Sequence, residues 1–232
     1  MATVTPTAGA FLRIIYQLRE DGIPVRRARI SERLGLSRPT VTQTVNRMVG
    51  SGLVQFGTGR YRNLELTELG EREAIVLVRR HRLAERLLTD VLHLSAHQAH
   101  LQAAKWDTLI DAATEQAIIE RLDDPRRSPW GNPVPGLDEL GIDVGGEGQR
   151  EPVCLTHLGP PGSTVRATVH SISEEAQDDA ELASGLVRAG IVPGAAVDVS
   201  ITDEDYQLVG LTRFDIPATL GHVIKIDVAP GE

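Results

Sequence analysis

Residues 26–50, RRARISERLGLSRPTVTQTVNRMVG, decide the fold of the first part of this chain. Residues 26–34 have the apolar spacing of a short helix, and Gly35 supplies a tight turn after it. Ser37 is a natural N-cap for a second helix, and Pro39 fits the first turn of that helix without losing a hydrogen bond. The stretch therefore predicts a helix, a turn and a second helix.

The sequence on both sides completes a recognisable unit. A preceding amphipathic helix is predicted over residues 7–21. Two short strands are predicted at Leu53–Phe56 and Arg62–Thr67, with the turn-forming residues 57–59 between them. Helices in this order followed by a β-hairpin predict a winged helix-turn-helix domain, which we assign to residues 1–73.

The rest of the chain changes character twice. Amphipathic helices predicted over residues 68–92 and about 95–122 indicate a helical domain at 74–141. Residues 142–162 are rich in Gly and Pro and predict a flexible linker. Alternating apolar residues in 163–232 predict a small all-β domain. The expected fold class is therefore mainly α with small β parts (α+β).

The charge of the chain is unevenly distributed. Its 232 residues include 24 Lys and Arg against 32 Asp and Glu, a formal net charge of −8. That average argues against nucleic-acid binding, which usually requires a basic surface. Residues 1–72, however, hold 11 arginines and six acidic residues, net +5, whereas 73–140 are net −3 and 141–232 are net −10. The first third is therefore a basic unit.

The sequence does not support several classes of protein. The single cysteine, Cys154, excludes an internal disulfide, and its pairing with His157 is only a weak metal signal. No apolar run could span a membrane and no secretory signal is evident, so we expect a cytoplasmic protein without a membrane partner. No phosphate loop, His-Glu-x-x-His helix or Ser/His/Asp arrangement indicates an enzyme.

The second helix of the motif carries side chains suited to reading DNA. The start of this helix enters the major groove in helix-turn-helix proteins, where Gln43 can pair with adenine and Pro39 can contact a thymine methyl group. Arginines around it can bind phosphates. The alternative is that Ser37 only caps the helix and the arginines form a solvated surface, but the complete motif favours DNA binding. The candidate DNA-binding residues are Arg27, Arg29, Ser37, Arg38, Pro39, Thr40, Thr42, Gln43, Arg47 and Arg60.

Three polar residues in the helical domain are candidate metal ligands. His81 and Glu85 lie four residues apart, on the apolar face of one predicted helix, where a divalent cation could satisfy both. His100 on the next helix could supply a third ligand. Such N/O ligands suit Fe²⁺, Mn²⁺, Co²⁺, Ni²⁺ or Zn²⁺. The alternative is a His–Glu hydrogen bond without metal.

The sequence resembles the diphtheria toxin repressor/iron-dependent regulator family of bacterial metalloregulators. The matching segments are RARISERLGLSRPTVTQTVNRM (27–48), RRHRLAERLLTDVL (79–92) and RSPWGNPVPGLDELG (127–141). The resemblance implies a DNA-binding domain, a helical dimerisation domain with two metal sites, and an SH3-like C-terminal β-barrel. It also implies homodimers that bind palindromic double-stranded operators when Fe²⁺ or Mn²⁺ is present.

For the ancillary metal site, the resemblance implies His81, Glu85 and His100 as ligands. It also implies a Glu and a Gln from the SH3-like domain. Counting back from AGIVPG (189–194) places these near Asp179 and Leu182, so one ligand is shortened and the other lost.

The primary, activating site departs further from the family pattern. Its ligand positions fall on Ala10, Ala104, Asp107 and Thr108, of which only Asp107 keeps a carboxylate. A methyl group cannot ligate a metal, and Thr is a poor substitute for imidazole. We therefore expect this site to be largely lost.

These observations predict a dimeric transcriptional repressor of metal-homeostasis or related genes that keeps only the ancillary site. Metal there could stabilise the dimer, DNA binding could have become independent of metal, or another ligand could have taken over. A hypothesis from a different class is a metal-binding protein-interaction module that binds no operator. The basic first third and the intact Ser37–Thr44 segment speak against that class.

Overall fold

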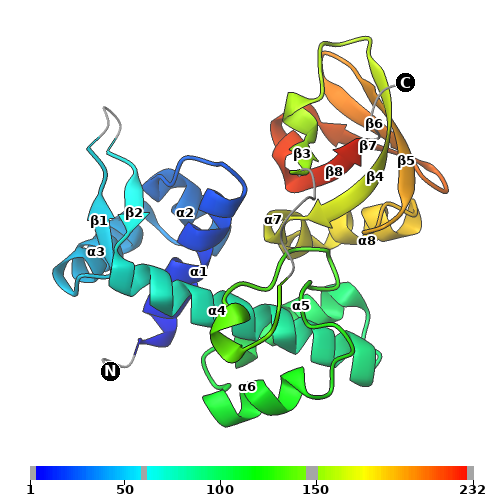
Figure 1. Ribbon diagram of the computed structural model, residues 1–232. Helices are drawn as coiled ribbons and strands as arrows, with labels where there is room; N and C mark the ends of the chain where they lie inside the picture. Colours follow the sequence, from blue (N-terminus) through cyan, green and yellow to red (C-terminus); the bar gives the residue numbers. More distant parts are fainter. Residues whose placement is uncertain (1–3, 59–61, 145–150, 229–232) are drawn as a thin grey trace.

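The computed structural model describes residues 4–58, 62–144 and 151–228, which form three units along the chain (Figure 1). The first unit is the expected winged helix-turn-helix. Its elements are α1 (Pro6–Glu20), α2 (Arg27–Leu34), α3 (Arg38–Gly50), β1 (Val54–Phe56) and β2 (Leu64–Leu66). The two strands pair antiparallel to form the wing.

Local sequence signals set the helix boundaries of this unit. Ser37 caps α3 by accepting a hydrogen bond from the backbone N–H of Thr40 at 3.3 Å. Gly35 ends α2 in the left-handed conformation at φ 61°, which glycine adopts without steric cost. The apolar faces of α1, α2 and α3 form a buried core whose members include Phe11, Ile30 and Val45. The exposed face of α3 is thus held by a packed scaffold.

The second unit is helical. Its elements are α4 (Glu68–Arg86), the π-helix η1 (Leu87–Val91), α5 (Ala96–Trp106), α6 (Ala112–Ile119) and the 3₁₀ turn η2 (Asp138–Leu140). The single helix expected over residues 95–122 is wrong. Asp111 accepts a hydrogen bond from the backbone N–H of Thr114 at 2.8 Å and so starts α6 as a separate helix. Figure 1 shows α4 extending from the first unit into the second.

The third unit contains a six-stranded antiparallel sheet in the order β3-β8-β4-β5-β6-β7. Its strands are β3 (Val153–Cys154), β4 (Thr164–Ile172), β5 (Ala196–Ile201), β6 (Asp205–Val209), β7 (Arg213–Pro217) and β8 (Ile224–Val228), with 3₁₀ turns η3 (Leu155–His157) and η4 (Ala218–Val223). Because β3 pairs with β8, Val153 and Cys154 belong to this sheet, although they lie within the range 142–162 predicted as a linker. The turn η3 follows β3 directly.

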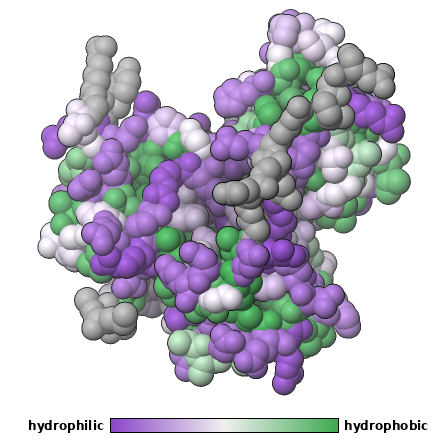
Figure 2. All heavy atoms as spheres, in the orientation of Figure 1, coloured by the Kyte–Doolittle hydropathy of each residue, from purple (hydrophilic) through white to green (hydrophobic). Residues whose placement is uncertain are grey.

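Two helices of the third unit were not predicted from sequence. They are α7 (Glu174–Asp178) and α8 (Ala180–Arg188), which follow β4 directly. Both pack against α5, so α7 lies where the third unit meets the second. Hydrophilic residues gather in the region between the first and third units in the space-filling view (Figure 2). Within the described residues, no helix is long and apolar enough to cross a membrane.

Candidate metal centre and nucleic-acid interface

The start of α3 presents its polar side chains to solvent. Ser37, Arg38, Pro39, Thr40, Gln43 and Arg47 are exposed, and Thr42 is half-buried. The buried residues of the same helix, including Val41 and Val45, face the core. The helix therefore has the two faces that major-groove reading requires, one packed and one free.

Basic side chains flank this helix from two elements. Arg27 and Arg29 are exposed on α2, where Arg29 pairs with Glu32 at 3.2 Å. Arg27 and Arg62 lie on the ring of Phe56 in β1, with guanidinium carbons 5.1 and 5.2 Å from the ring centre. The Arg27 contact joins α2 to the wing, and Arg62 adds a second guanidinium group on the same ring. Arg60, the remaining wing candidate, lies outside the described residues.

The three predicted metal ligands come together in the second unit. His81 and Glu85 on α4 face His100 on α5, and all three are buried. His81 Nε2 lies 3.1 Å from Glu85 Oε1 and 3.2 Å from His100 Nδ1, and His100 Nδ1 lies 2.7 Å from Glu85 Oε1. Neighbouring ligands of an ion bound at about 2.1 Å lie roughly 3 Å apart. The spacing therefore suits one first-row divalent cation.

The buried surroundings set the charges of these groups. Burial lowers the pKa of His81, which keeps the ring neutral as ligation requires. Burial opposes ionisation of Glu85, but its polar interactions with His81 and His100, including hydrogen bonds from both rings, outweigh burial and lower the pKa of Glu85 to about 2. Burial also acts against protonated His100, yet hydrogen bonds to Asp178 and Glu85 raise its pKa to about 9.

Asp107 lies beside the cluster but pairs with another group. Its Oδ2 is 3.4 Å from Arg13 Nη1 and 4.0 Å from His81 Nδ1. The same Arg13 nitrogen donates to His81 Nδ1 at 2.8 Å. Asp107 is thus the partner of an arginine from α1, and it is not among the grouped ligand atoms of His81, Glu85 and His100.

The other positions that the resemblance assigns to the primary site are Ala10, Ala104 and Thr108. Ala104 and Thr108 are exposed, and Ala10 is half-buried. A Cβ built at Gly9 would lie 3.4 Å from both the Thr108 methyl group and a Leu77 methyl group. Thr108 therefore packs its methyl group close to α1.

The prediction that Asp179 ligates the metal is corrected by the structure. Asp179 is exposed and caps α8, where its carboxylate accepts from the backbone N–H groups of Glu181 and Leu182. The neighbouring Asp178 contacts the cluster instead, with Oδ1 2.9 Å from His100 Nε2. Counting along the sequence missed it because the position depends on how α7 packs against α5.

Glu174 and Gln177 are the buried Glu and Gln that α7 brings to this region. Sequence counting missed this pair as well, although the Glu-x-x-Gln spacing at 174–177 was a usable signal. The Oε1 atom of Gln177 and the Oε2 atom of Glu85 are both buried without a hydrogen-bond partner. Two buried oxygen acceptors without donors fit a bound cation.

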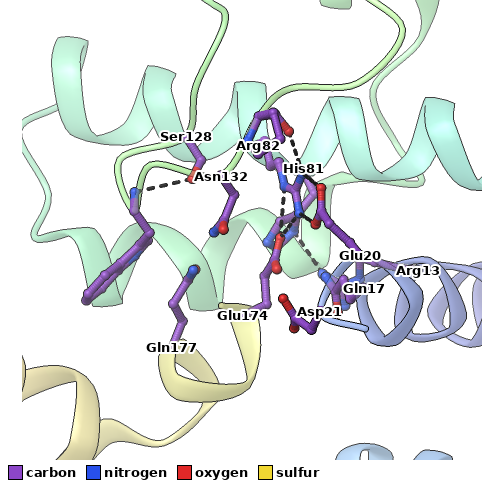
Figure 3. Close-up of polar contacts among 12 residues, drawn as sticks. Arg13, Gln17, Glu20, Asp21, His81, Arg82, Ser128, Asn132, Glu174 and Gln177 are labelled. Carbon is purple, nitrogen blue, oxygen red and sulfur yellow. Dashed lines mark hydrogen bonds and ion pairs between the residues drawn. The ribbon is translucent and has the colours of Figure 1, made fainter. Parts of the chain in front are cut away.

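A fully buried arginine, Arg82 of α4, lies next to the cluster (Figure 3). Its guanidinium pairs with Glu174 of α7 at 2.7 Å and with Glu20 of α1 at 2.5 Å. Although burial alone would raise the pKa of Glu174, the Arg82 charge lowers it. One side chain of the second unit thus binds a carboxylate from each of the other two units.

Cys154 and His157 do not add to the metal cluster. Cys154 is a free, half-buried residue of β3, and burial raises the pKa of its thiol. His157 is exposed on η3. Among the described residues, His81, Glu85 and His100 form the cluster of three potential ligands that the structure contains.

Comparisons with known proteins agree with a DNA-binding first unit followed by a helical, metal-binding second unit. Residues 3–60 match the family described as the iron dependent repressor N-terminal DNA binding domain, and residues 67–136 match its metal binding and dimerisation domain. The chain is 40% identical over 231 residues to the iron-dependent repressor IdeR of Mycobacterium tuberculosis, covering 98% of this chain and 99% of that protein. It is 42% identical over 233 residues to the diphtheria toxin repressor of Corynebacterium glutamicum, covering both in full.

Solved structures show the same fold. The crystal structure of T. acidophilum IdeR superposes with a TM-score of 0.74 at 23% identity, covering 99% of this chain and all of that one. A manganese-dependent transcriptional repressor in complex with manganese superposes with a TM-score of 0.77 at 22% identity, covering 95% of this chain and 99% of that one. The chain belongs to the diphtheria toxin repressor/IdeR family of metal-dependent, DNA-binding transcriptional repressors, which are not enzymes.

Proposed function

We propose that this chain binds palindromic operator DNA as a homodimer, in the cytoplasm, and that a divalent metal at His81, Glu85 and His100 controls this binding. The observation that carries the proposal is the convergence of three buried ligand atoms from α4 and α5, with separations of 2.7–3.2 Å. The family relationship favours Fe²⁺ or Mn²⁺, and the N/O ligands also accept Co²⁺, Ni²⁺ and Zn²⁺. The expected regulated genes are those of metal homeostasis.

The residues present fit such an ion. Glu85 Oε2 and Gln177 Oε1 are buried acceptors without donors, and His81 is held neutral by burial. We assign Glu174 and Gln177 as the residues that the third unit contributes to this metal site. A bound ion would supply positive charge to this buried site, which is rich in acceptors. Because the residues that would hold it come from α4, α5 and α7, its binding would favour the arrangement of the three units in which these helices meet.

We further propose that contacts between side chains of this chain have replaced the primary, activating metal site of the family. Arg13 of α1 places its guanidinium within 3.4 Å of Asp107, the one remaining carboxylate, and 2.8 Å from His81. A cationic side chain is thus located where the family pattern expects a cation to act. The alanines at 10 and 104 and the Thr108 methyl group offer no ligand atoms.

A second candidate function is operator binding that needs no metal. It is favoured by the Arg13–Asp107 pair and by Arg82, which connect the DNA-binding unit to the rest of the chain through protein charges alone. In this case the metal cluster would contribute to stability without switching DNA binding.

One titration distinguishes the two functions. Chelator-treated protein is mixed with a palindromic duplex selected from random sequences, and Fe²⁺, Mn²⁺, Co²⁺ or Zn²⁺ is added stepwise while binding is followed by fluorescence anisotropy. Metal control predicts weak binding before addition and a saturable increase after it. Equal binding throughout would favour the metal-independent function, and no binding to any duplex would contradict both.

Replacing Gln43 by Ala is expected to weaken specific operator binding by about 1–3 kcal/mol if its amide reads a base. Gln43 is exposed on α3, so its replacement should leave the stability of the fold nearly unchanged. Asn46→Ala, at an exposed position further along the same helix, is the matched control. Equal operator affinity of the two variants, measured at one salt concentration, would remove Gln43 from the reading surface.

A further inference from the structure

One carboxylate connects the metal cluster to the DNA-binding unit. Asp178, the last residue of α7, lies 2.9 Å through Oδ1 from His100 Nε2. Its other oxygen, Oδ2, accepts a hydrogen bond from Arg33 Nη2 at 3.0 Å. Arg33 belongs to α2, the first helix of the helix-turn-helix. Three residues from three units therefore form a continuous chain of polar contacts.

We propose that Asp178 is a positioning residue that orients His100 for metal binding and transmits the occupancy of the site to α2. This inference rests on the metal site proposed above. The role of Asp178 follows from the position of α7, which brings this carboxylate to His100 of α5 and to Arg33 of α2.

The orientation part of the proposal follows from the two ring nitrogens of His100. Nδ1 faces Glu85 and His81, so it is the nitrogen available to a metal. Metal-bound histidines typically donate the N–H of the other nitrogen to a carboxylate, which fixes the tautomer and the ring plane. Asp178 stands at that other nitrogen. It is therefore placed to keep the proton on Nε2 and to leave Nδ1 free for the ion.

The transmission part follows from the surroundings of Arg33. This side chain is 7% exposed, and its Nε and Nη1 atoms have no hydrogen-bond partner. Glu175 lies 3.7 Å away, outside hydrogen-bonding distance, and Gln17 accepts from Nη2 at 3.4 Å. Asp178 thus provides the short charged hydrogen bond of this buried arginine. A shift of His100 that moves Asp178 is therefore expected to change the position of Arg33 and of α2.

The third unit also contacts the first unit independently of Asp178. Lys225 of β8 donates to the backbone carbonyl of Glu20 at 2.9 Å and lies 3.4 Å from Asp21. Loss of the Asp178 carboxylate should therefore loosen α2 without releasing the whole third unit. This makes variants at position 178 suitable for a specific test.

The test uses the full chain with Asp178→Asn, Arg33→Met, the double variant, and Asp179→Asn as matched control. Asn at 179 removes the neighbouring charge but still caps α8. Chelator-treated proteins are titrated with Co²⁺, whose visible absorption reports coordination. Asp178→Asn is expected to raise the dissociation constant about 10–100-fold, as outer partners of metal-bound histidines do. Asp179→Asn should bind as the unaltered chain does.

Arg33→Met should weaken Co²⁺ binding less than Asp178→Asn, and the double variant should match Asp178→Asn because both changes break one chain of contacts. Co²⁺ affinity of Asp178→Asn equal to that of the unaltered chain would overturn the proposal. Multiplying effects in the double variant would also overturn it, since the two residues would then act independently.

Amide hydrogen exchange without metal provides a second readout. Amide exchange across α2 is expected to be faster in Asp178→Asn than in Asp179→Asn. Amide exchange in α3 is the internal reference and should be the same in the two variants. Equal protection of α2 in both variants would contradict the link to the DNA-binding unit. If the unaltered chain bound no Co²⁺, the proposed metal site would fail, and this second readout would still decide whether Asp178 holds α2.

Discussion

Replacing Arg82 by Met is expected to lower the free energy of unfolding by about 3–5 kcal/mol, because it leaves buried carboxylates without their cation. Arg82 is fully buried and Glu174 is 2% exposed, so water cannot replace the lost partner of Glu174. The second carboxylate, Glu20, belongs to α1 and loses its contact with α4 at the same time. The contacts of all three units are therefore expected to weaken together.

The measurement is urea unfolding of chelator-treated protein, followed by circular dichroism. Arg72→Met is the control, because Arg72 lies on the same helix but is 59% exposed in its pair with Glu68. Exposed pairs contribute about 0–1 kcal/mol, so this control should change little. Equal midpoints for the two variants would contradict the role of Arg82.

A further variant tests the physical reason. Adding Glu20→Gln and Glu174→Gln to Arg82→Met removes the unpaired charges, so part of the lost stability should return. No recovery would mean that packing of the arginine stem, and not charge, accounts for the loss.

The winged helix-turn-helix was predictable because its signals are local. The Ser37 cap, the turn at Gly35 and the apolar spacing of residues 26–34 lie within one short stretch, and each determines the backbone beside it. The two short strands predicted after this stretch pair antiparallel as β1 and β2. The break between α5 and α6 was missed because Asp111 was not read as a helix cap within an apparently continuous helix.

The residues of the candidate metal site likewise differ in whether local sequence could predict them. His81 and Glu85 could be paired from sequence because residues four apart share a helix face. The roles of Asp178, Glu174 and Gln177 depend on α7, a helix of five residues that is too short to be stable without tertiary contacts. Their approach to α4 and α5 is set by docking of the third unit, which no periodicity encodes. Arg13 and Arg82 were missed for the same reason.

Replacing His81 by Ala is expected to abolish metal retention. His81 supplies one of three buried ligand atoms, and its Nε2 lies within 3.2 Å of both other ligands. Losing a direct ligand should exceed the about 10–100-fold loss of affinity caused by removing an outer partner. Metal content is measured by elemental analysis after the protein is loaded with Mn²⁺ or Co²⁺ and passed through a desalting column.

Two companion variants keep this result interpretable. Glu85→Gln preserves the shape of the buried side chain and removes its charge, so it tests ligation where His81→Ala also opens a cavity. His157→Ala changes the exposed histidine near Cys154 and should retain metal as the unaltered chain does. If His157→Ala lost metal and His81→Ala kept it, the ion would belong to the third unit. The buried histidines of α4 and α5 would then be a hydrogen-bonded polar network of the helical unit and no sensor.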